Sequence, residues 1–172
     1  QRIVPEDLSG VVAVASGEGH SVALREDGTV IVWGRDHLGQ RRVPEGLSGV
    51  TAIDSGYYHN LALDSEGRVN AWGSNQFGET AVPADLGRAI AVATGWRHSL
   101  ALQEDGTVVA WGFNNRGQTN VPAGLRDIVA IAGGGEHSLA LRADGTVVAW
   151  GRNSRGQSRV PAGLDRVVAI SA

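Results

Sequence analysis

The 172-residue chain contains no cysteine, no methionine and no lysine. Without cysteine there are no disulfides and no thiolate metal sites, and the redox compartment stays open. The 15 basic residues are all arginine and are outnumbered by 18 acidic ones, so the net charge of −3 provides no bulk attraction to nucleic acid. No apolar run approaches 18 residues, and no basic-then-apolar leader is present. We therefore expect neither a nucleic-acid partner nor a membrane.

The chain repeats itself every 39 residues, and this repeat decides the architecture. One unit runs from 11 to 49, and the others cover 50–88, 89–127 and 128–166. Partial repeats at 1–10 and 167–172 complete a single domain. Each unit repeats a His, a Trp-Gly pair and a Val-Pro pair at the same positions: His20, His59, His98 and His137; Trp33, Trp72, Trp111 and Trp150; Pro44, Pro83, Pro122 and Pro161, with Pro5 in the same phase.

Each unit predicts four short strands, which in the first unit cover 11–16, 20–24, 29–33 and 41–44. These runs are rich in Val, Ile and Trp and are bounded by Gly, Asp and Pro. Asp27-Gly28, between the second and third runs, is typical of a tight hairpin turn. The first and third strands are apolar on both faces, so both faces of each small sheet must be covered. We expect an all-β fold, a β-propeller of about four 39-residue four-stranded blades, over a linear β-solenoid.

Two stretches and their copies carry a family resemblance: GHSVALREDGTVIVWG at 19–34 and GQTNVPAGL at 117–125. They resemble the regulator-of-chromosome-condensation repeat family. The ungapped, short-looped form is similar to the bacterial branch that includes the propeller-type β-lactamase inhibitory proteins. The resemblance implies a propeller fold over the whole chain. It implies little about function, because this family includes exchange factors, enzyme inhibitors and many other modules.

The number of units differs from the seven blades usual in that family. Residues 1–16 have the same repeat phase as residues 157–172, so the second and third strands of a blade are missing where the ends would meet. The chain also starts with Gln1 and has no Met, which predicts a processed product or an excised piece. Three arrangements remain: a fragment of a larger propeller, an open fan, or an incomplete ring completed by another chain. We favour a homo-oligomer that completes the ring, since bare blade faces promote association.

Sequence variation between the units falls in two stretches, the connection between the first and second strands and the residues after the third. In an antiparallel meander these two connections lie at the same end of the sheet. All five aromatic residues outside the Trp repeat occur there. The predicted partner-binding residues are Tyr57, Tyr58, Trp96, Arg97, Phe77, Phe113, Arg35, Asp36 and His37. Aromatic and Arg side chains dominate the energetics of protein interfaces.

Catalysis and cofactor binding find little support in the sequence. The four periodic histidines predict one structural hydrogen bond per blade to a neighbouring turn, and their separation argues against a shared metal. The carboxylates are mostly turn residues, such as Asp27 and Asp105. We expect no catalytic residues, no metal and no cofactor, and hence no enzyme. The predicted function is a non-catalytic module that binds a protein through its aromatic loop face. The alternatives are a secreted enzyme inhibitor of the β-lactamase-inhibitory type and a carbohydrate-binding propeller.

Overall fold

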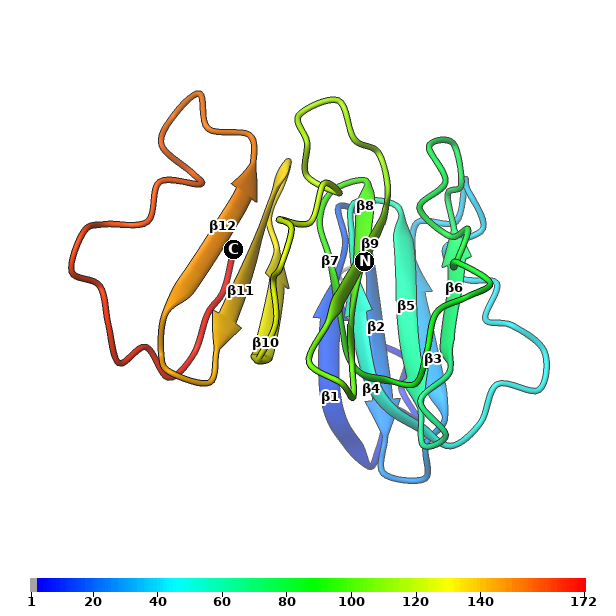
Figure 1. Cartoon of the computed structure of the whole chain (residues 1–172). Helices are drawn as coiled ribbons and strands as arrows, with labels where there is room; N and C mark the ends of the chain where they lie inside the picture. Colours follow the sequence, from blue (N-terminus) through cyan, green and yellow to red (C-terminus); the bar gives the residue numbers. More distant parts are fainter. Residues whose placement is uncertain (1–2) are drawn as a thin grey trace.

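A computed structural model describes residues 3–172 and contains four three-stranded antiparallel sheets. Each sheet has the strand order of the chain, and together they form four blades (Figure 1). The strands are β1 (Val11–Ser16), β2 (His20–Arg25) and β3 (Val30–Gly34) in blade 1; β4 (Val50–Ser55), β5 (His59–Asp64) and β6 (Val69–Gly73) in blade 2; β7 (Ala89–Thr94), β8 (His98–Gln103) and β9 (Val108–Gly112) in blade 3; and β10 (Ile128–Gly133), β11 (His137–Arg142) and β12 (Val147–Gly151) in blade 4.

The predicted fold class is confirmed, but the fourth strand expected in each blade is not a strand. In blade 1 the segment 41–44 lies within a series of turns. The Arg42 amide donates to the Gly39 carbonyl, and the Leu47 amide donates to the Pro44 carbonyl. These two amides donate to nearby carbonyls, and Pro44 has no amide hydrogen that could be donated to a neighbouring strand. The long connection after the third strand therefore covers the blade without extending its sheet.

The turn between the second and third strands forms as the Asp-Gly pairs predict. Gly28 has a φ of +78°, a conformation that favours glycine. The Asp27 carboxylate accepts hydrogen bonds from the Thr29 amide at 2.9 Å and its hydroxyl at 2.7 Å. The bonds from Thr29 hold the pKa of Asp27 below its ordinary value. Asp105 and Asp144 bond Thr107 and Thr146 in the same way, so these carboxylates support turns.

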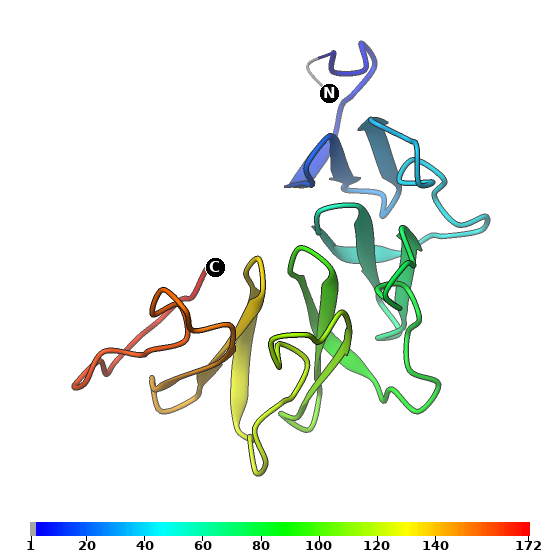
Figure 2. The ribbon, with the colours of Figure 1, turned by 90° about the horizontal axis from the view of Figure 1, so that it is seen from above.

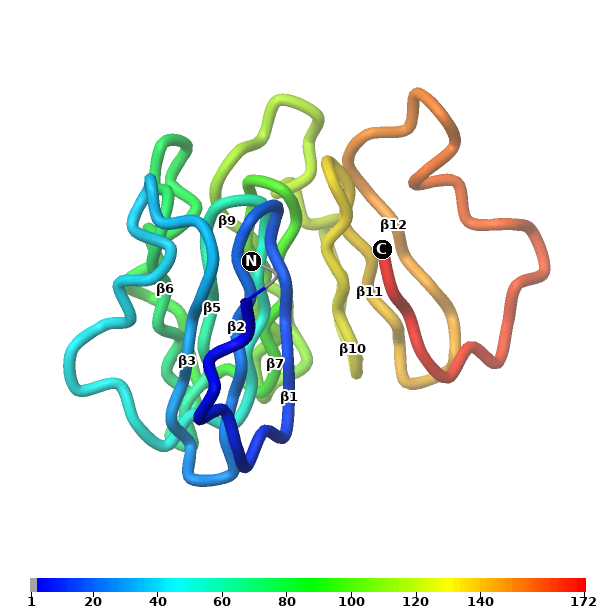
Figure 3. Tube along the Cα trace, turned by 180° about the vertical axis from the view of Figure 1, so that it is seen from behind, coloured from blue at the N-terminus to red at the C-terminus, as the bar shows by residue number. Residues whose placement is uncertain are grey.

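The four blades are arranged along an open arc (Figure 2). First strands of adjacent blades are neighbours along its inner side, β1 with β4, β4 with β7 and β7 with β10. The N-terminal segment leads into blade 1 and the C-terminal segment runs beside blade 4, so the two ends do not meet (Figure 3). No helix within residues 3–172 is long and apolar enough to cross a membrane.

The hydrophobic core lies between the blades, in one cluster for each pair of neighbours. The cluster between blades 1 and 2 includes Leu24, Val50, Ala62 and Trp72. The cluster between blades 2 and 3 contains the corresponding Trp111, and the one between blades 3 and 4 contains Trp150. Trp72, Trp111 and Trp150 thus pack against the preceding blade, as expected of residues that fill the space between blades.

A polar relay crosses each of these junctions. At the junction of blades 2 and 3, His59 Nε2 lies 3.0 Å from Ser99 Oγ, and the Ser99 hydroxyl donates to the Glu79 carbonyl at 2.8 Å. Since Ser99 donates its only proton there, it accepts from His59, which fixes the Nε2–H tautomer. Trp111 Nε1 donates to the same Glu79 carbonyl at 2.9 Å. One backbone carbonyl of blade 2 therefore receives two donors from blade 3.

The same relay recurs at the other two junctions. His98 bonds Ser138 at 3.0 Å, while Ser138 and Trp150 both donate to the Gln118 carbonyl. At the first junction, Asn60 replaces the serine and bonds His20 at 2.7 Å. The predicted structural role is thus correct for His20, His59 and His98, but the partner of each is a strand residue of the next blade and not a turn. A strand side chain is held more rigidly than a loop residue, which suits a contact that sets the spacing between blades.

The glycine three residues before each His is required by space. A Cβ on Gly56 would overlap the His59 ring and the Gly95 carbonyl of the next blade. Gly17 and Gly95 stand in the same relation to His20 and His98. The G-x-x-H frame is therefore constant because its first residue leaves room for the ring of the last and for the neighbouring backbone.

Burial of the relay histidines disfavours their charged form. Desolvation lowers the pKa of His59 from 6.5 to about 3, with added repulsion from His98 and His20. Desolvation also lowers the pKa of His98 to about 4, with a contribution from His137. Within residues 3–172, Nδ1 of both rings is buried without a hydrogen-bond partner, which fits a neutral imidazole that donates only through Nε2.

We expect Gly56→Ala to destabilise the protein by about 3 kcal/mol. The added Cβ would overlap the His59 ring and the Gly95 carbonyl, so blades 2 and 3 would have to move apart. Gly46→Ala is the matched control, since a Cβ there meets nothing within 4 Å and the cost is confined to its φ of +77°, about 1 kcal/mol. Urea unfolding monitored by tryptophan fluorescence measures both changes. Equal losses in the two variants would contradict the steric role of Gly56.

Stability is expected to fall as the pH drops below 6.5. The unfolded chain then binds protons that the folded His59 and His98 do not, until the pH reaches about 4 for His98 and about 3 for His59. Each of these two histidines contributes a loss of about 2 kcal/mol between pH 7 and pH 5. Urea midpoints at the two pH values test this. His59→Gln, which keeps an N–H donor but cannot titrate, should show a smaller pH dependence, whereas identical slopes would contradict the prediction.

Candidate functional site

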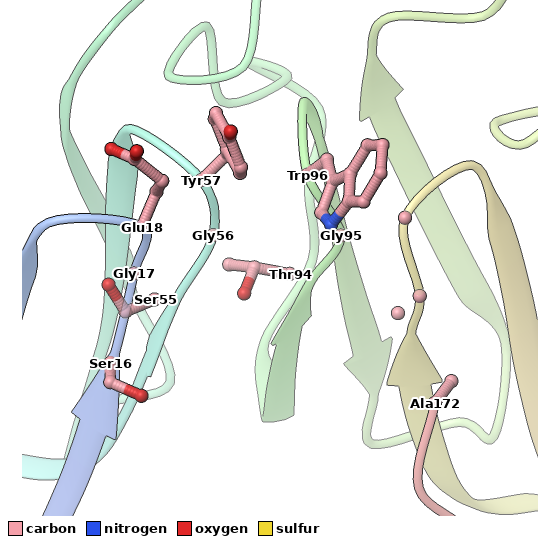
Figure 4. Close-up of a pocket in the computed structure, with 13 residues that line it drawn as sticks. Ser16, Gly17, Glu18, Ser55, Gly56, Tyr57, Thr94, Gly95, Trp96 and Ala172 are labelled. Atoms are coloured by element: carbon pink, nitrogen blue, oxygen red, sulfur yellow. The ribbon is translucent and has the colours of Figure 1, made fainter.

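The loops between the first and second strands are joined to one another across the blades by backbone hydrogen bonds. The Glu18 amide donates to the Tyr57 carbonyl at 3.2 Å, and the Tyr57 amide donates to the Trp96 carbonyl at 3.1 Å. A pocket lies on the inner side of the arc, between the ends of the first strands. In Figure 4, Glu18, Tyr57 and Trp96 stand at one rim of this inner pocket, while Ser16 and Ser55 lie deeper. The variable side chains of successive blades are thus held at fixed spacing along one rim.

Rings from blades 1, 2 and 3 form a continuous series. His37 meets Tyr58 edge-on with centroids 5.2 Å apart, and Tyr58 meets Tyr57 in the same way at 4.6 Å. Tyr57 in turn lies 5.7 Å from Trp96. Trp96 remains 55% exposed, although it is the largest side chain of the series. An indole this open to solvent, supported on one side by a tyrosine, offers a preformed apolar surface.

A second group of rings comes from the loops after the third strands. Phe77 and Phe113 lie 4.6 Å apart, and the Arg97 guanidinium sits 5.1 Å above the Phe77 ring. Arg97 has no carboxylate partner within residues 3–172. We call His37, Tyr57, Tyr58, Phe77, Trp96, Arg97 and Phe113 the aromatic surface.

The two groups of rings border one hollow of about 230 Å³. Its lining consists of Tyr57, Trp96, Arg97, Phe113, Gly135 and Glu136. Gly135 lies directly against the Trp96 ring, where a Cβ would come within 3.0 Å of it. The hollow is large enough for a single side chain of a partner and combines apolar walls with one unpaired positive charge.

Ion pairs flank the aromatic surface on both sides. In blade 1, Arg35 bonds Glu18 at 2.7 Å, and in blade 4, Arg152 bonds Glu136 at 2.6 Å. The Asp36 carboxylate accepts the Arg41 amide at 2.9 Å and therefore holds its own loop. Seven of the nine residues predicted from sequence are thus gathered in the aromatic surface, whereas Arg35 and Asp36 are engaged in contacts within blade 1.

Sequence reasoning missed Glu136 and Gly135 as parts of the hollow. The pairs Glu18–Arg35 and Glu136–Arg152 each join the two variable stretches of one blade, across 17 and 16 residues of sequence. An acidic residue at one variable position and Arg at the other distinguishes the outer blades from the inner ones.

Nothing in the described part of the chain gathers three or more His, Asp or Glu side chains in reach of one metal ion. The second, inner pocket measures about 350 Å³ and is lined largely by backbone and small side chains of the first strands. The side chains at the rim offer apolar contact, cation–π contact and hydrogen bonding.

Three-stranded blades joined side by side around an arc, with the connections between their strands at the two ends of each blade, define a β-propeller type of architecture. The chain belongs to the regulator of chromosome condensation (RCC1) repeat family, whose model matches residues 11–40, 50–79, 89–118 and 128–157. No curated protein matches the chain.

Solved structures of similar fold include yeast RCC1 (Prp20) bound to Kap60, with a TM-score of 0.79 at 24% identity, over 94% of this chain and 48% of that one. A second structure of Prp20p from Saccharomyces cerevisiae, described together with its binding to Gsp1p and histones, has a TM-score of 0.70 at 24% identity, over 82% of this chain and 45% of that one. Human WBSCR16 has a TM-score of 0.72 at 24% identity, over 82% of this chain and 47% of that one. The chain thus spans about half the length of these structures.

Replacing Trp96 by Ala is expected to lower stability by at most about 1 kcal/mol, because the indole is more than half exposed. Trp111→Ala should cost about 3–5 kcal/mol, since Trp111 is buried in the junction core. Thermal unfolding followed by circular dichroism compares the two variants. If Trp96→Ala were as destabilising as Trp111→Ala, Trp96 would belong to the core and not to a binding surface.

Proposed function

We propose that this protein is a non-catalytic interaction module that binds another protein through the aromatic surface. The observation that carries the proposal is the exposed Trp96, which closes a series of ring contacts from His37 to Trp96 beside an unpaired Arg97. Rigid rings lose little conformational entropy on binding, and Arg and Trp are the residue types on which interface affinity depends most.

The repeat frame supports this proposal by separating folding from display. The residues that hold neighbouring blades together are the glycine, His and Trp of each unit, and none of them belongs to the aromatic surface. The variable letters can therefore change without loss of the His–Trp relay or of the apolar clusters between blades. A propeller that presents variable loops from a constant frame is suited to recognition, because loop residues positioned by a rigid scaffold commonly carry function.

The solved structures of similar fold agree with a protein partner, since those of yeast Prp20 concern its binding to Kap60, Gsp1p and histones. For the present chain we propose a protein partner and no direct nucleic-acid or membrane contact. A carbohydrate would require equivalent pockets in successive blades, whereas the variable letters differ from blade to blade. We further propose that the four blades act as part of a larger ring, because the arc is open and the chain spans about half of the similar structures.

The combined variant Tyr57→Ala, Tyr58→Ala and Trp96→Ala should keep the native fold and lose partner capture, with at least about a 100-fold drop in affinity if two of these rings are central to the interface. A pull-down from native material, followed by titration of the captured protein, measures the effect. The matched control is Arg88→Ala with Glu104→Ala, an exposed ion pair near the turns between second and third strands, at the opposite end of the blades.

The control variant should capture the same protein as the wild type. Loss of capture in both variants, or in neither, would reject the aromatic surface as the binding site. An inhibition assay with a β-lactamase and a glycan array examine the two alternative targets with the same set of variants. Retention of either activity by the triple variant would place that activity elsewhere on the protein.

A further inference from the structure

The two ends of the arc expose complementary halves of the junction that recurs inside it. Val14 in β1 is 72% exposed. Its counterparts in the later blades, Ile53, Val92 and Ile131, all pack against the junction clusters. Val11 is 38% exposed, whereas its counterpart Val50 is 5% exposed. The outer face of blade 1 is therefore a junction face without a preceding blade.

Blade 4 carries the other half of the junction. His137 occupies the position of His59 and His98, which are fully buried, yet it is only partly buried and bonds no side chain in the described part of the chain. Leu139 is likewise partly buried, whereas its counterparts Leu61 and Leu100 are fully buried. The next blade would have to supply a serine to His137, and Ser21 of blade 1 occupies that position in the repeat.

The C-terminal segment 167–172 already lies where the first strand of a fifth blade would run. The Val167 amide bonds the Gly145 carbonyl at 3.1 Å, as the Val50 amide bonds the Gly28 carbonyl at 3.2 Å. Ala172 lines the inner pocket together with Ser16, Ser55, Thr94 and Gly133, which share its repeat position (Figure 4). The segment pairs with no strand, and Val168 is 92% exposed.

From these observations we infer that two copies of this chain associate head to tail into one closed ring, in which β1 of each copy replaces segment 167–172 on blade 4 of the other. The inference rests on the proposal that the four blades belong to a larger ring, and it names a second copy as the source of the missing blades. Ile170 and Val14 occupy the same repeat position, so the exchange substitutes one apolar contact for another.

The second copy is favoured by continuity with an interface that the chain already makes three times. Each new junction would add a His137–Ser21 hydrogen bond and cover Val14 and Leu139, and the ring would contain two such junctions. Head-to-tail contacts of this kind close into a ring when the rotation per subunit allows it. Two copies also match the length of the similar propellers, of which one copy covers 48% and 45%.

Sedimentation velocity and native mass spectrometry of the full chain test the inference. We expect the wild type to have twice the mass of one chain at micromolar concentration. Val14→Asp should weaken self-association at least about 100-fold, because it buries an unpaired carboxylate at the junction. Val12→Asp is the matched control, since Val12 and its counterparts Ile90 and Val129 are all exposed, so this position faces no junction. Val12→Asp should associate like the wild type.

Ile170→Asp gives a test of opposite sign. It loosens segment 167–172 from blade 4 and should therefore strengthen self-association, whereas a merely structural role for the segment would leave it unchanged or weaken it. A wild type that stays monomeric to about 100 μM, a mass other than two chains, or equal association of Val14→Asp and Val12→Asp would overturn the inference. The Tyr57, Tyr58 and Trp96 alanine variant should still form the two-chain species, so failure of the ring and failure of the aromatic surface are distinguishable.

Discussion

The fold depends on a backbone carbonyl that receives two donors from the next blade. At each junction the carbonyl of Gln40, Glu79 or Gln118 is bonded by an indole N–H and by a side chain that also contacts the His of the preceding blade. A buried carbonyl without a hydrogen-bond partner is costly. Sliding one blade against the next would therefore leave several buried polar groups unpaired at once. The apolar clusters supply most of the attraction between blades, and this relay fixes the position at which they meet.

Much of this architecture could be predicted from the sequence because the repeat exposes which residues are constant. The 39-residue period, the strand positions and the Asp-Gly turns follow from local chemistry that is the same in every unit. The conformation of segment 41–44 could not be predicted in that way, because a short run before Pro44 is compatible with an edge strand and with a covering loop. The choice depends on where the amides of this segment find acceptors, which is a property of the folded blade.

The candidate site was predicted less completely, for a related reason. The parity of the connections placed Tyr57, Tyr58, Trp96, Phe77 and Phe113 at one rim. The ring contacts gather them in two groups, one of Tyr57, Tyr58 and Trp96 and the other of Phe77 and Phe113. Which charged residues remain available could not be read from position alone. Arg35 and Arg97 both lie in variable stretches. Arg35 forms an ion pair with Glu18 of its own blade, whereas the Arg97 guanidinium lies over the Phe77 ring. Charge availability is decided by neighbours that come from the other stretch.

The backbone bonds that tie Glu18 to Tyr57 and Tyr57 to Trp96 have a consequence for how such surfaces can diversify. They involve only main-chain atoms, so they persist whatever side chains the loops carry. New combinations of residues can therefore arise at the rim by single substitutions, or by duplication of a whole unit, while the distances between neighbouring positions stay the same. The main-chain bonds thus set the spacing of the loops, while the side chains that would contact a partner can change independently.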